Sequence, residues 1–251
     1  MTARVAQIWR HPIKSHGCEA LARIAVTAGR TLPFDRVWAV LHEAAKADGS
    51  GWAPCVNFSI GSKAPGLMAI SAELDEGTGR VRLTHPDRPV LDLNPDDPAE
   101  LPGFLDWVRP LMPADRAASA RIVRVAGRGM TDTDYPSASL AGLGSLAALS
   151  DRMGQPLDSR RFRINFWIDG LEPWEEFGWI GREIAVGGAR FRVEERIRRC
   201  KATTANPETG LCDADTLAAL ESGWGHRDLG VYLAPIGSGE VAPGDAVTVL
   251  P

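Results

Sequence analysis

Four cysteines in 251 residues are too few and too scattered to build a disulfide framework. No two of them form a Cys-x-x-Cys pair, the spacing typical of structural zinc and iron–sulfur sites. Long apolar stretches are also missing, since no run approaches the roughly 20 residues of a transmembrane helix. The first residues, MTARVAQIWRH, lack the apolar core of a secretory signal. We therefore expect a cytoplasmic protein without a membrane segment.

The chain also lacks an excess of positive charge. Its formal net charge is −4, whereas general nucleic-acid binders need a surplus of Lys and Arg to neutralise phosphates. Basic residues gather locally instead, because Lys and Arg outnumber Asp and Glu within 158–201. This distribution indicates a small anionic ligand and argues against a nucleic-acid partner. The hydrophobic content of 44% is that of an ordinary globular protein.

One cysteine, Cys200, stands in a cationic stretch with no acid between 196 and 201. Neighbouring cations favour the thiolate form of a cysteine, which attacks electrophiles and ligates soft metals. A thiol beside anion-binding groups suits a ligand that carries both a soft metal and a phosphate. The alternative is a buried core cysteine beside arginines that form a solvated strand face. The cationic neighbours are Arg196, Arg198, Arg199 and Lys201.

The N-terminal third is patterned as short antiparallel strands. Runs rich in Val, Ile, Leu and Trp predict strands over 4–9, 21–26 and 34–41, and a further pair over 67–74 and 80–84. Pro12 ends the first run and leaves Lys14 and Ser15 on a loop, where they are either an oxyanion site or solvated loop residues. Arg36, at the entrance of the third run, either pairs with Asp35 or points at a ligand. Residues 44–66 are expected to form a surface excursion.

Three helices are predicted further along the chain. Asp97, Pro98 and Glu100 match a capping box that starts the first. The second covers 140–153, capped by Ser137 or Ser139 and ended by Gly154, and the third is capped by Asp213 or Asp215. Residues 113–139 are weakly patterned and are expected to form a crossover.

The remaining strands surround the cationic stretch. Alternation over 163–168 predicts that Arg163 and Asn165 project from one face of a strand toward one ligand. Gly187 and Gly188 form the turn of a hairpin over 182–193 that leads into the Cys200 segment. A final strand pair is predicted over 229–234 and 246–250.

In this order the pieces resemble the MOSC-domain family, named for the C-terminal domain of molybdenum cofactor sulfurase. The resemblance implies a mainly β fold with helices (α+β), in which a MOSC-type β-barrel follows a smaller N-terminal β-barrel subdomain. The subdomain would cover 1–95 and the MOSC domain 96–251, with the boundary between about 90 and 125. The matching motifs are HPIKS at 11–15, DRVW at 35–38, RFRIN at 161–165, RCKATTANPETG at 199–210 and GD at 244–245.

The resemblance also implies a molybdenum cofactor, with the metal held by the dithiolene of a pyranopterin. By position Cys200 is the metal ligand and catalytic residue, and the segment 135–137 borders the cofactor. The family is further associated with pyridoxal phosphate. This chain departs from the family at Arg198, often a small residue, at Ile164, often Pro, and at Asn206, often Asp. The implied cofactor-binding residues are Lys14, Ser15, Arg36, Arg163, Asn165, Arg199 and Cys200.

The implied activity is reduction of N-hydroxylated small molecules. Electrons would come from a separate protein, such as a ferredoxin, a flavodoxin or a cytochrome b5-like protein with its reductase. Two alternatives stay open. In the first, the chain is a carrier protein in which Cys200 holds a persulfide or hands the cofactor to another protein, with Cys212 as the resolving thiol. In the second, the chain is a non-catalytic barrel that has lost the cofactor. On the enzyme hypothesis Cys18, Cys55 and Cys212 are dispensable, since none has a cationic setting.

Overall fold

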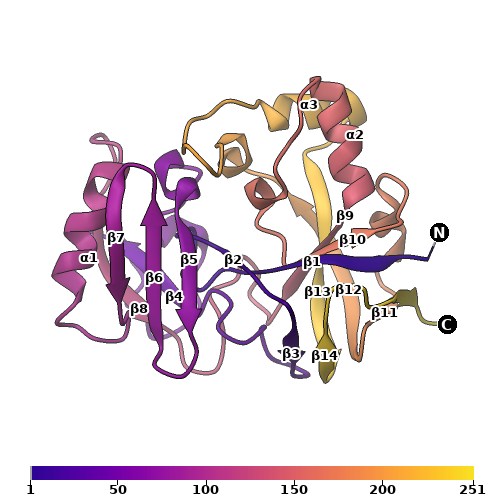
Figure 1. Ribbon diagram of the computed structural model, residues 1–251, viewed down its shortest axis with the longest axis horizontal. Helices are drawn as coiled ribbons and strands as arrows, with labels where there is room; N and C mark the ends of the chain where they lie inside the picture. Colours follow the sequence, from indigo (N-terminus) through magenta and orange to yellow (C-terminus); the bar gives the residue numbers. More distant parts are fainter. Residues whose placement is uncertain (1) are drawn as a thin grey trace.

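The computed structural model describes residues 2–251 as two β-rich lobes that lie side by side (Figure 1). One lobe contains strands β4 to β8 and helix α1, and the other contains β9 to β15 together with the first strands of the chain. The predicted mainly β class with few helices is confirmed. Within residues 2–251 no helix is both long and apolar enough to cross a bilayer.

The larger lobe is organised on an eight-stranded sheet with the order β15-β11-β12-β13-β9-β10-β1-β2. Strand β1 pairs antiparallel with β10, which pairs parallel with β9, so the start of the chain is built into the C-terminal sheet. Of the strand predicted over 21–26 only Ile24–Val26 forms a strand, β3, and the short strand β2 lies just before the predicted range. The strands of this lobe are β1 Arg4–Arg10, β2 Glu19–Ala20, β3 Ile24–Val26, β9 Ala138–Gly142, β10 Phe166–Asp169, β11 Glu183–Val186, β12 Ala189–Arg198, β13 Asp228–Gly237, β14 Gly239–Val241 and β15 Val247–Val249.

The predicted hairpin is present as β11 and β12, turning at Gly187 and Gly188. Gly187 has φ of +55°, a left-handed conformation that glycine adopts without strain. The predicted pairing of the last two strands is wrong. Strand β13 lies between β12 and β9, while β15 pairs with β11, because the apolar faces of both strands are buried in the larger sheet.

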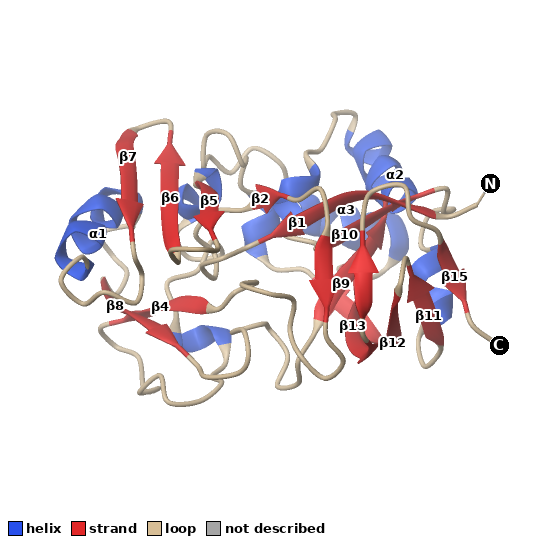
Figure 2. Ribbon diagram, turned by 60° about the horizontal axis from the view of Figure 1, so that its bottom comes forward, coloured by secondary structure: helices blue, strands red, loops and turns tan. Residues whose placement is uncertain are grey.

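The smaller lobe contains a three-stranded sheet, β5-β6-β7, and the pair β4-β8, which Figure 2 shows as a separate layer. A short 3₁₀ helix, Pro65–Ala69, replaces the start of the strand predicted over 67–74. Strands β7 and β8 were not predicted, since β7 contains Pro89 and most of β8 is only half-buried. The strands are β4 Trp38–His42, β5 Ser71–Asp75, β6 Arg80–His85, β7 Arg88–Leu93 and β8 Ser119–Arg124.

Two of the predicted helix starts are wrong. Helix α1, Leu101–Val108, begins without a side-chain cap, because Glu100 instead accepts hydrogen bonds from Arg80 and from the Asn94 amide. Helix α2, Leu143–Met153, begins after Gly142, since residues 138–142 are needed in the sheet as β9. Gly154 ends α2 as predicted, with φ of +66°. Helix α3, Thr216–Trp224, is capped by Asp215, which accepts from the Ala218 amide at 3.1 Å.

The apolar core is also divided between the lobes. One cluster joins the N-terminal residues Val5, Ile8 and Val26 to the inner faces of β9 to β13, and another surrounds Trp38 and Phe104 in the smaller lobe. The domain boundary at 95/96 stays a prediction. Several short 3₁₀ segments connect the strands. They are Cys55–Asn57, Pro65–Ala69, Arg109–Leu111, Ser159–Phe162, Glu175–Trp179 and Lys201–Thr204.

Candidate functional site

A cleft of about 840 Å³, including the solvent at its open mouth, is lined by residues of both lobes. All seven residues implied by the resemblance line it, so the fold brings the loop after β1 next to the end of β12. The cleft is rich in positive charge and contains two thiols, from Cys55 and Cys200. Its basic side chains are those of Lys14, Arg36, Arg161, Arg163, Arg198 and Arg199.

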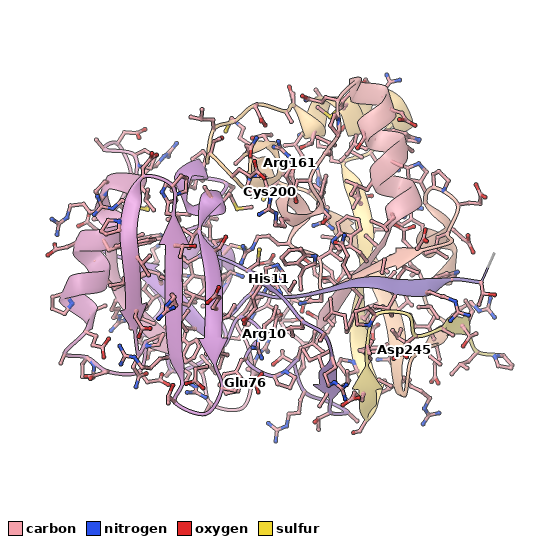
Figure 3. The ribbon with its side chains drawn as sticks, in the orientation of Figure 1. Arg10, His11, Glu76, Arg161, Cys200 and Asp245 are labelled. Carbon is pink, nitrogen blue, oxygen red and sulfur yellow. The ribbon has the colours of Figure 1, made fainter. Side chains whose placement is uncertain are left out.

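Cys200 stands two residues beyond the end of β12 and directly precedes the 3₁₀ turn Lys201–Thr204. Its side chain is exposed to the cleft, while its carbonyl oxygen accepts from the amide and hydroxyl of Thr203 at 3.2 and 3.1 Å. The turn therefore holds the main chain and leaves the thiol free. Figure 3 shows Cys200 next to Arg161, where the two lobes meet. Within residues 2–251 no group of three or more His, Cys, Asp and Glu side chains is arranged to hold a metal ion.

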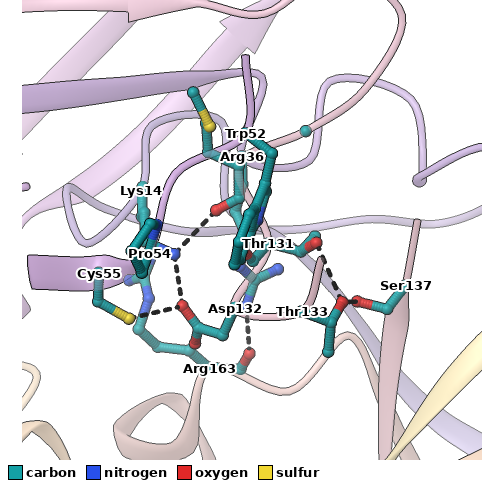
Figure 4. Close-up of polar contacts among 12 residues, drawn as sticks. Lys14, Arg36, Trp52, Pro54, Cys55, Thr131, Asp132, Thr133, Ser137 and Arg163 are labelled. Carbon is teal, nitrogen blue, oxygen red and sulfur yellow. Dashed lines mark hydrogen bonds and ion pairs between the residues drawn. The ribbon is translucent and has the colours of Figure 1, made fainter. Parts of the chain in front are cut away.

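Lys14 reaches across the floor of the cleft from the loop after β1. Its side chain is buried, its Nζ donates to the Met130 carbonyl oxygen at 2.8 Å, and it forms an ion pair with Asp132 (Figure 4). The surrounding protein desolvates the Asp132 carboxylate, but the cations Lys14 and Arg36 outweigh this effect and hold the pKa of Asp132 well below its usual range. Lys14 is therefore a paired cation and not a solvated loop lysine.

The sequence left open whether Arg36 pairs with Asp35 or points at a ligand; in the structure Arg36 pairs with Asp35 and also lines the cleft. One guanidinium nitrogen pairs with Asp35, and Nη2 donates to the Arg163 carbonyl oxygen at 2.7 Å. Asp35 is fully buried and also accepts from the His11 amide at 2.9 Å. Burial opposes the charged form of Asp35, yet Arg36 and His11 keep its pKa far below the ordinary value. Arg36 thus binds a carboxylate and still lines the cleft.

Arg163 was predicted on a strand, and this is wrong. It stands at the end of the 3₁₀ segment Ser159–Phe162 with φ of +51°, and β10 begins only at Phe166. Its buried Nη2 has no hydrogen-bond partner within residues 2–251, and the side chain makes no ion pair there. Burial first, then the neighbouring Arg36, lower the pKa of Arg163 to about 10, so the group stays charged at neutral pH. Arg163 is half-buried, and its desolvated Nη2 lacks a partner in the described chain that would offset the cost, which a bound anion would supply.

Asn165 therefore does not share a strand face with Arg163. It precedes β10, and its side chain is engaged in joining three segments of the sheet. Its Oδ1 accepts from the amide and hydroxyl of Ser139 at 3.1 and 2.9 Å, and its Nδ2 donates to the Trp9 carbonyl oxygen at 3.0 Å. Asn165 thus contributes to the cleft by fixing the positions of the segments that form its wall.

Arg199 supplies a second cation without a carboxylate partner in the described chain. Its guanidinium donates to the carbonyl oxygens of Leu229, at 2.8 Å from Nε, and of Phe162, at 2.9 Å from Nη1. Burial lowers the pKa of Arg199 to about 10. Main-chain dipoles orient this charge without neutralising it, so Arg163 and Arg199 together give the cleft a positive potential.

Several lining residues were not predicted. Cys55, on the 3₁₀ segment Cys55–Asn57, donates to Asp132 at 3.4 Å, and burial followed by Asp132 raises the pKa of this thiol to about 11. Ser137 borders the cleft as expected, whereas Tyr135 does not line it. Tyr232, on β13, completes the wall. The hydroxyl- and carboxylate-rich stretch 131–137 was the one feature of the sequence that pointed toward Asp132.

Residues 2–102 match the family model of the MOSC N-terminal beta barrel domain, and residues 137–248 match that of the MOSC domain. The chain is a MOSC-domain protein. This MOSC-domain protein is 24% identical to mitochondrial amidoxime-reducing component 1 of Mus musculus over 256 residues, covering 87% of this chain and 70% of that protein. A shorter match, 32% identical over 92 residues, links it to mitochondrial amidoxime reducing component 2 of Rattus norvegicus, covering 35% of this chain and 27% of that protein.

The fold of this MOSC-domain protein is also similar to the crystal structure of the YuaD protein of Bacillus subtilis. The TM-score is 0.50 at 13% sequence identity, and the match covers 98% of this chain and 94% of that one. At that identity the likeness concerns the fold alone.

The departures of this MOSC-domain protein from its family have local explanations. Asn206 donates from Nδ2 to Asp213 at 2.7 Å, and Asp213 pairs with Arg161, also at 2.7 Å. An aspartate at 206 would face the Asp213 carboxylate, so the amide suits this arrangement. Ile164 is buried in the core beneath β10, and Arg198 is exposed on the wall of the cleft.

Proposed function

We propose that this protein binds the molybdenum cofactor in the cleft between its lobes and reduces N-hydroxylated small molecules. Membership of the MOSC family supports an association with that cofactor. The similarity to proteins named amidoxime-reducing components supports the choice of reaction. One observation carries the proposal: Arg163, whose buried Nη2 has no partner within residues 2–251, lines the same cleft as the exposed thiol of Cys200.

The residues present fit a ligand of this kind. A pyranopterin that holds a metal through a dithiolene has an anionic phosphate and a soft metal, and the cleft offers unpaired cations and an exposed thiol. Arg163 and Arg199 are half-buried cations of the cleft that form no ion pair within residues 2–251, and the exposed Arg198 likewise forms none there. Ser15, with φ of +63° in the loop that carries Lys14, presents a hydroxyl to the same cleft. The donor set therefore matches both ends of the ligand.

Each residue has a distinct part in this proposal. Cys200 would bind the metal, and Arg163, Arg199 and Ser15 would bind the phosphate and pterin. The cofactor would supply two-electron transfer to the oxygen-bearing nitrogen, which releases water when two protons are also taken up. Lys14 and Asp132, which form an ion pair with each other, line the same cleft. Electrons would come from a separate donor protein of the ferredoxin, flavodoxin or cytochrome b5 type.

Metal and pterin analysis of the purified protein tests this proposal. We expect close to one molybdenum and one pterin per chain, and benzamidoxime reduction with a chemical electron donor. Protein that carries neither group after expression in a host that makes the cofactor, and that does not take up added cofactor, would contradict it.

The carrier alternative keeps one specific observation in its favour. Cys55 lines the same cleft as Cys200, whereas Cys212 does not and instead accepts from the Thr204 hydroxyl at 3.4 Å. A persulfide on Cys200 would then be discharged by Cys55, forming a Cys55–Cys200 disulfide and releasing hydrogen sulfide. Sulfane sulfur on Cys200 in the absence of molybdenum would favour this alternative over the reductase.

A further inference from the structure

Asp132 is the one acidic residue among the described residues that line the cleft. The other charged side chains in that lining all belong to lysine or arginine. Its side chain is 50% exposed, although the cations around it, Lys14 and Arg36, are almost fully buried. The proposed cofactor function, as argued above, assigns no ligand to this carboxylate.

The loop that carries Asp132 is held in place at nearly every residue. Gly129 lies so close to the Asp35 carbonyl oxygen that a Cβ atom there would collide with it. The Met130 carbonyl oxygen accepts from Lys14, and the Thr131 carbonyl oxygen accepts from the Trp52 indole at 2.9 Å. These contacts come from three separate segments, so the position of Asp132 depends on the fold and not on its own loop alone.

Beyond Asp132 the same loop is held again. Thr133 shares a hydrogen bond of 2.7 Å with the Ser137 hydroxyl, and the Arg128 guanidinium donates to the carbonyl oxygens of Thr133, at 3.0 Å, and Asp134, at 2.7 Å. The loop is thus restrained on both sides of Asp132. A carboxylate presented this rigidly is suited to recognise a ligand without paying the entropy of ordering a loop.

The two carboxylate oxygens of Asp132 have different surroundings (Figure 4). Oδ1 accepts from the Lys14 ammonium and from the Cys55 thiol at 3.4 Å. Oδ2 has no partner within residues 2–251, and the side chain is open to the cleft. Asp132 therefore presents one free, ionised acceptor in a cleft whose other charged side chains are all cations.

We infer that Asp132 is a specificity-determining residue that selects substrates with N–H donors beside the N-hydroxy group, such as amidoximes and N-hydroxyguanidines. Its free Oδ2 accepts one of those N–H groups and orients the neighbouring N–O bond. Tertiary N-oxides have no N–H group and gain nothing from this oxygen. The inference rests on the proposed reductase function and adds the substrate class to it. No covalent or redox step is assigned to Asp132.

The variant Asp132→Asn tests substrate recognition by Asp132 while keeping a side-chain acceptor that positions Lys14. The Asn carbonyl oxygen keeps an acceptor for Lys14, while the amide nitrogen replaces the free acceptor with a donor. We expect kcat/KM for benzamidoxime to fall about 10- to 100-fold, the range for loss of one hydrogen bond to a charged group. For pyridine N-oxide, measured as substrate or as competitive inhibitor, we expect a change within about threefold.

Asp134→Asn is the matched control, because it removes the same charge two residues away, outside the cleft. Both substrates should respond to this control variant as they do to wild type. Molybdenum and pterin content of all three proteins is measured alongside. An equal loss for both substrates in Asp132→Asn, or no loss for benzamidoxime, overturns the inference.

A binding measurement keeps the inference distinguishable from the proposed function. Benzamidine carries N–H donors but no N–O bond, so its binding to the cofactor-loaded protein, followed by titration calorimetry, needs no turnover. If wild type reduces neither substrate, the reductase proposal fails. The recognition role of Asp132 then stands if benzamidine binds wild type and Asp134→Asn at least about tenfold more tightly than Asp132→Asn, and it falls if the three bind alike or none binds.

Discussion

Arg36 donates from Nη2 to the main-chain carbonyl oxygen of Arg163 at 2.7 Å, joining two residues that are 127 positions apart in the chain. Both residues have left-handed backbones, with φ of +53° and +51°. Such conformations are uncommon for residues other than glycine and persist only where the surroundings hold them. Here each arginine stands at a tight turn, and the hydrogen bond from Arg36 to the Arg163 carbonyl oxygen joins the two turns. The wall of the cleft thus depends on this contact.

Arg36→Met should strongly destabilise the protein. It would leave Asp35, which is fully buried, without its cationic partner, a loss of about 3–5 kcal/mol for a broken buried pair. The double variant with Asp35→Asn should recover part of that loss, because the uncompensated charge is gone. Urea unfolding measures both. Arg23→Met, which breaks the exposed pair with Glu240, is the control and should cost less than about 1 kcal/mol. A single variant as stable as the control would show that the buried pair is not needed.

Arg163→Gln should lower cofactor content without destabilising the cofactor-free protein. Its buried Nη2 satisfies no partner within residues 2–251, so removing the charge relieves a desolvation cost. Loss of a charge-assisted contact of about 1.5–3 kcal/mol predicts roughly 10- to 100-fold weaker cofactor retention. Arg161→Gln is the matched control, since Arg161 pairs with Asp213 and should lower the melting temperature instead. Equal melting shifts in both variants would speak against an anion site at Arg163.

Cys200→Ser should give a folded protein that has lost most reduction of benzamidoxime. An alkoxide or hydroxyl is a harder ligand than a thiolate, so both metal affinity and redox behaviour should change. Cys212→Ser, outside the cleft, should retain wild-type molybdenum and activity. The two variants are compared by molybdenum and pterin per chain and by turnover with a chemical donor. Wild-type turnover in Cys200→Ser would remove this thiol from the mechanism.

Acid should destabilise the fold through His16. Burial, the largest cause, lowers the pKa of His16 to about 4 from 6.5, although the hydrogen bond of Nδ1 with the Lys14 carbonyl opposes the shift. The unfolded chain therefore binds a proton on this residue from about pH 6.5 downward, while the folded chain does so only near pH 4. Stability is present above pH 6.5 and is lost as the pH falls between these values, by about 3 kcal/mol.

The measurement is the urea midpoint of wild type and His16→Asn at pH 7, 6 and 5. Asn can still donate to the Lys14 carbonyl but does not titrate, so its midpoint should depend less on pH. His11 acts in the same direction, since burial, Arg36 and Arg163 lower its pKa to about 3, and it should preserve part of the slope in the variant. Identical slopes in the two proteins would show that His16 is not the titrating group.

The sequence by itself determined the features that depend on neighbours along the chain. The Gly187-Gly188 hairpin, the Asp215 cap and the glycine that ends α2 were all predictable, because turn and cap conformations depend on residues a few positions apart. The ordered motifs that resemble the MOSC family also indicated the class of fold and the set of residues lining the cleft.

Only the tertiary structure decided how those residues are used. Arg163 adopts a left-handed turn because Arg36, far away in sequence, holds its carbonyl oxygen, and residues 138–142 form a strand because β10 and β13 flank them. Asp132 faces the cleft because Lys14 and Trp52 hold its loop from the other end of the chain. Alternation and capping patterns do not encode such contacts, since the partners lie far outside the few neighbouring residues that these patterns describe.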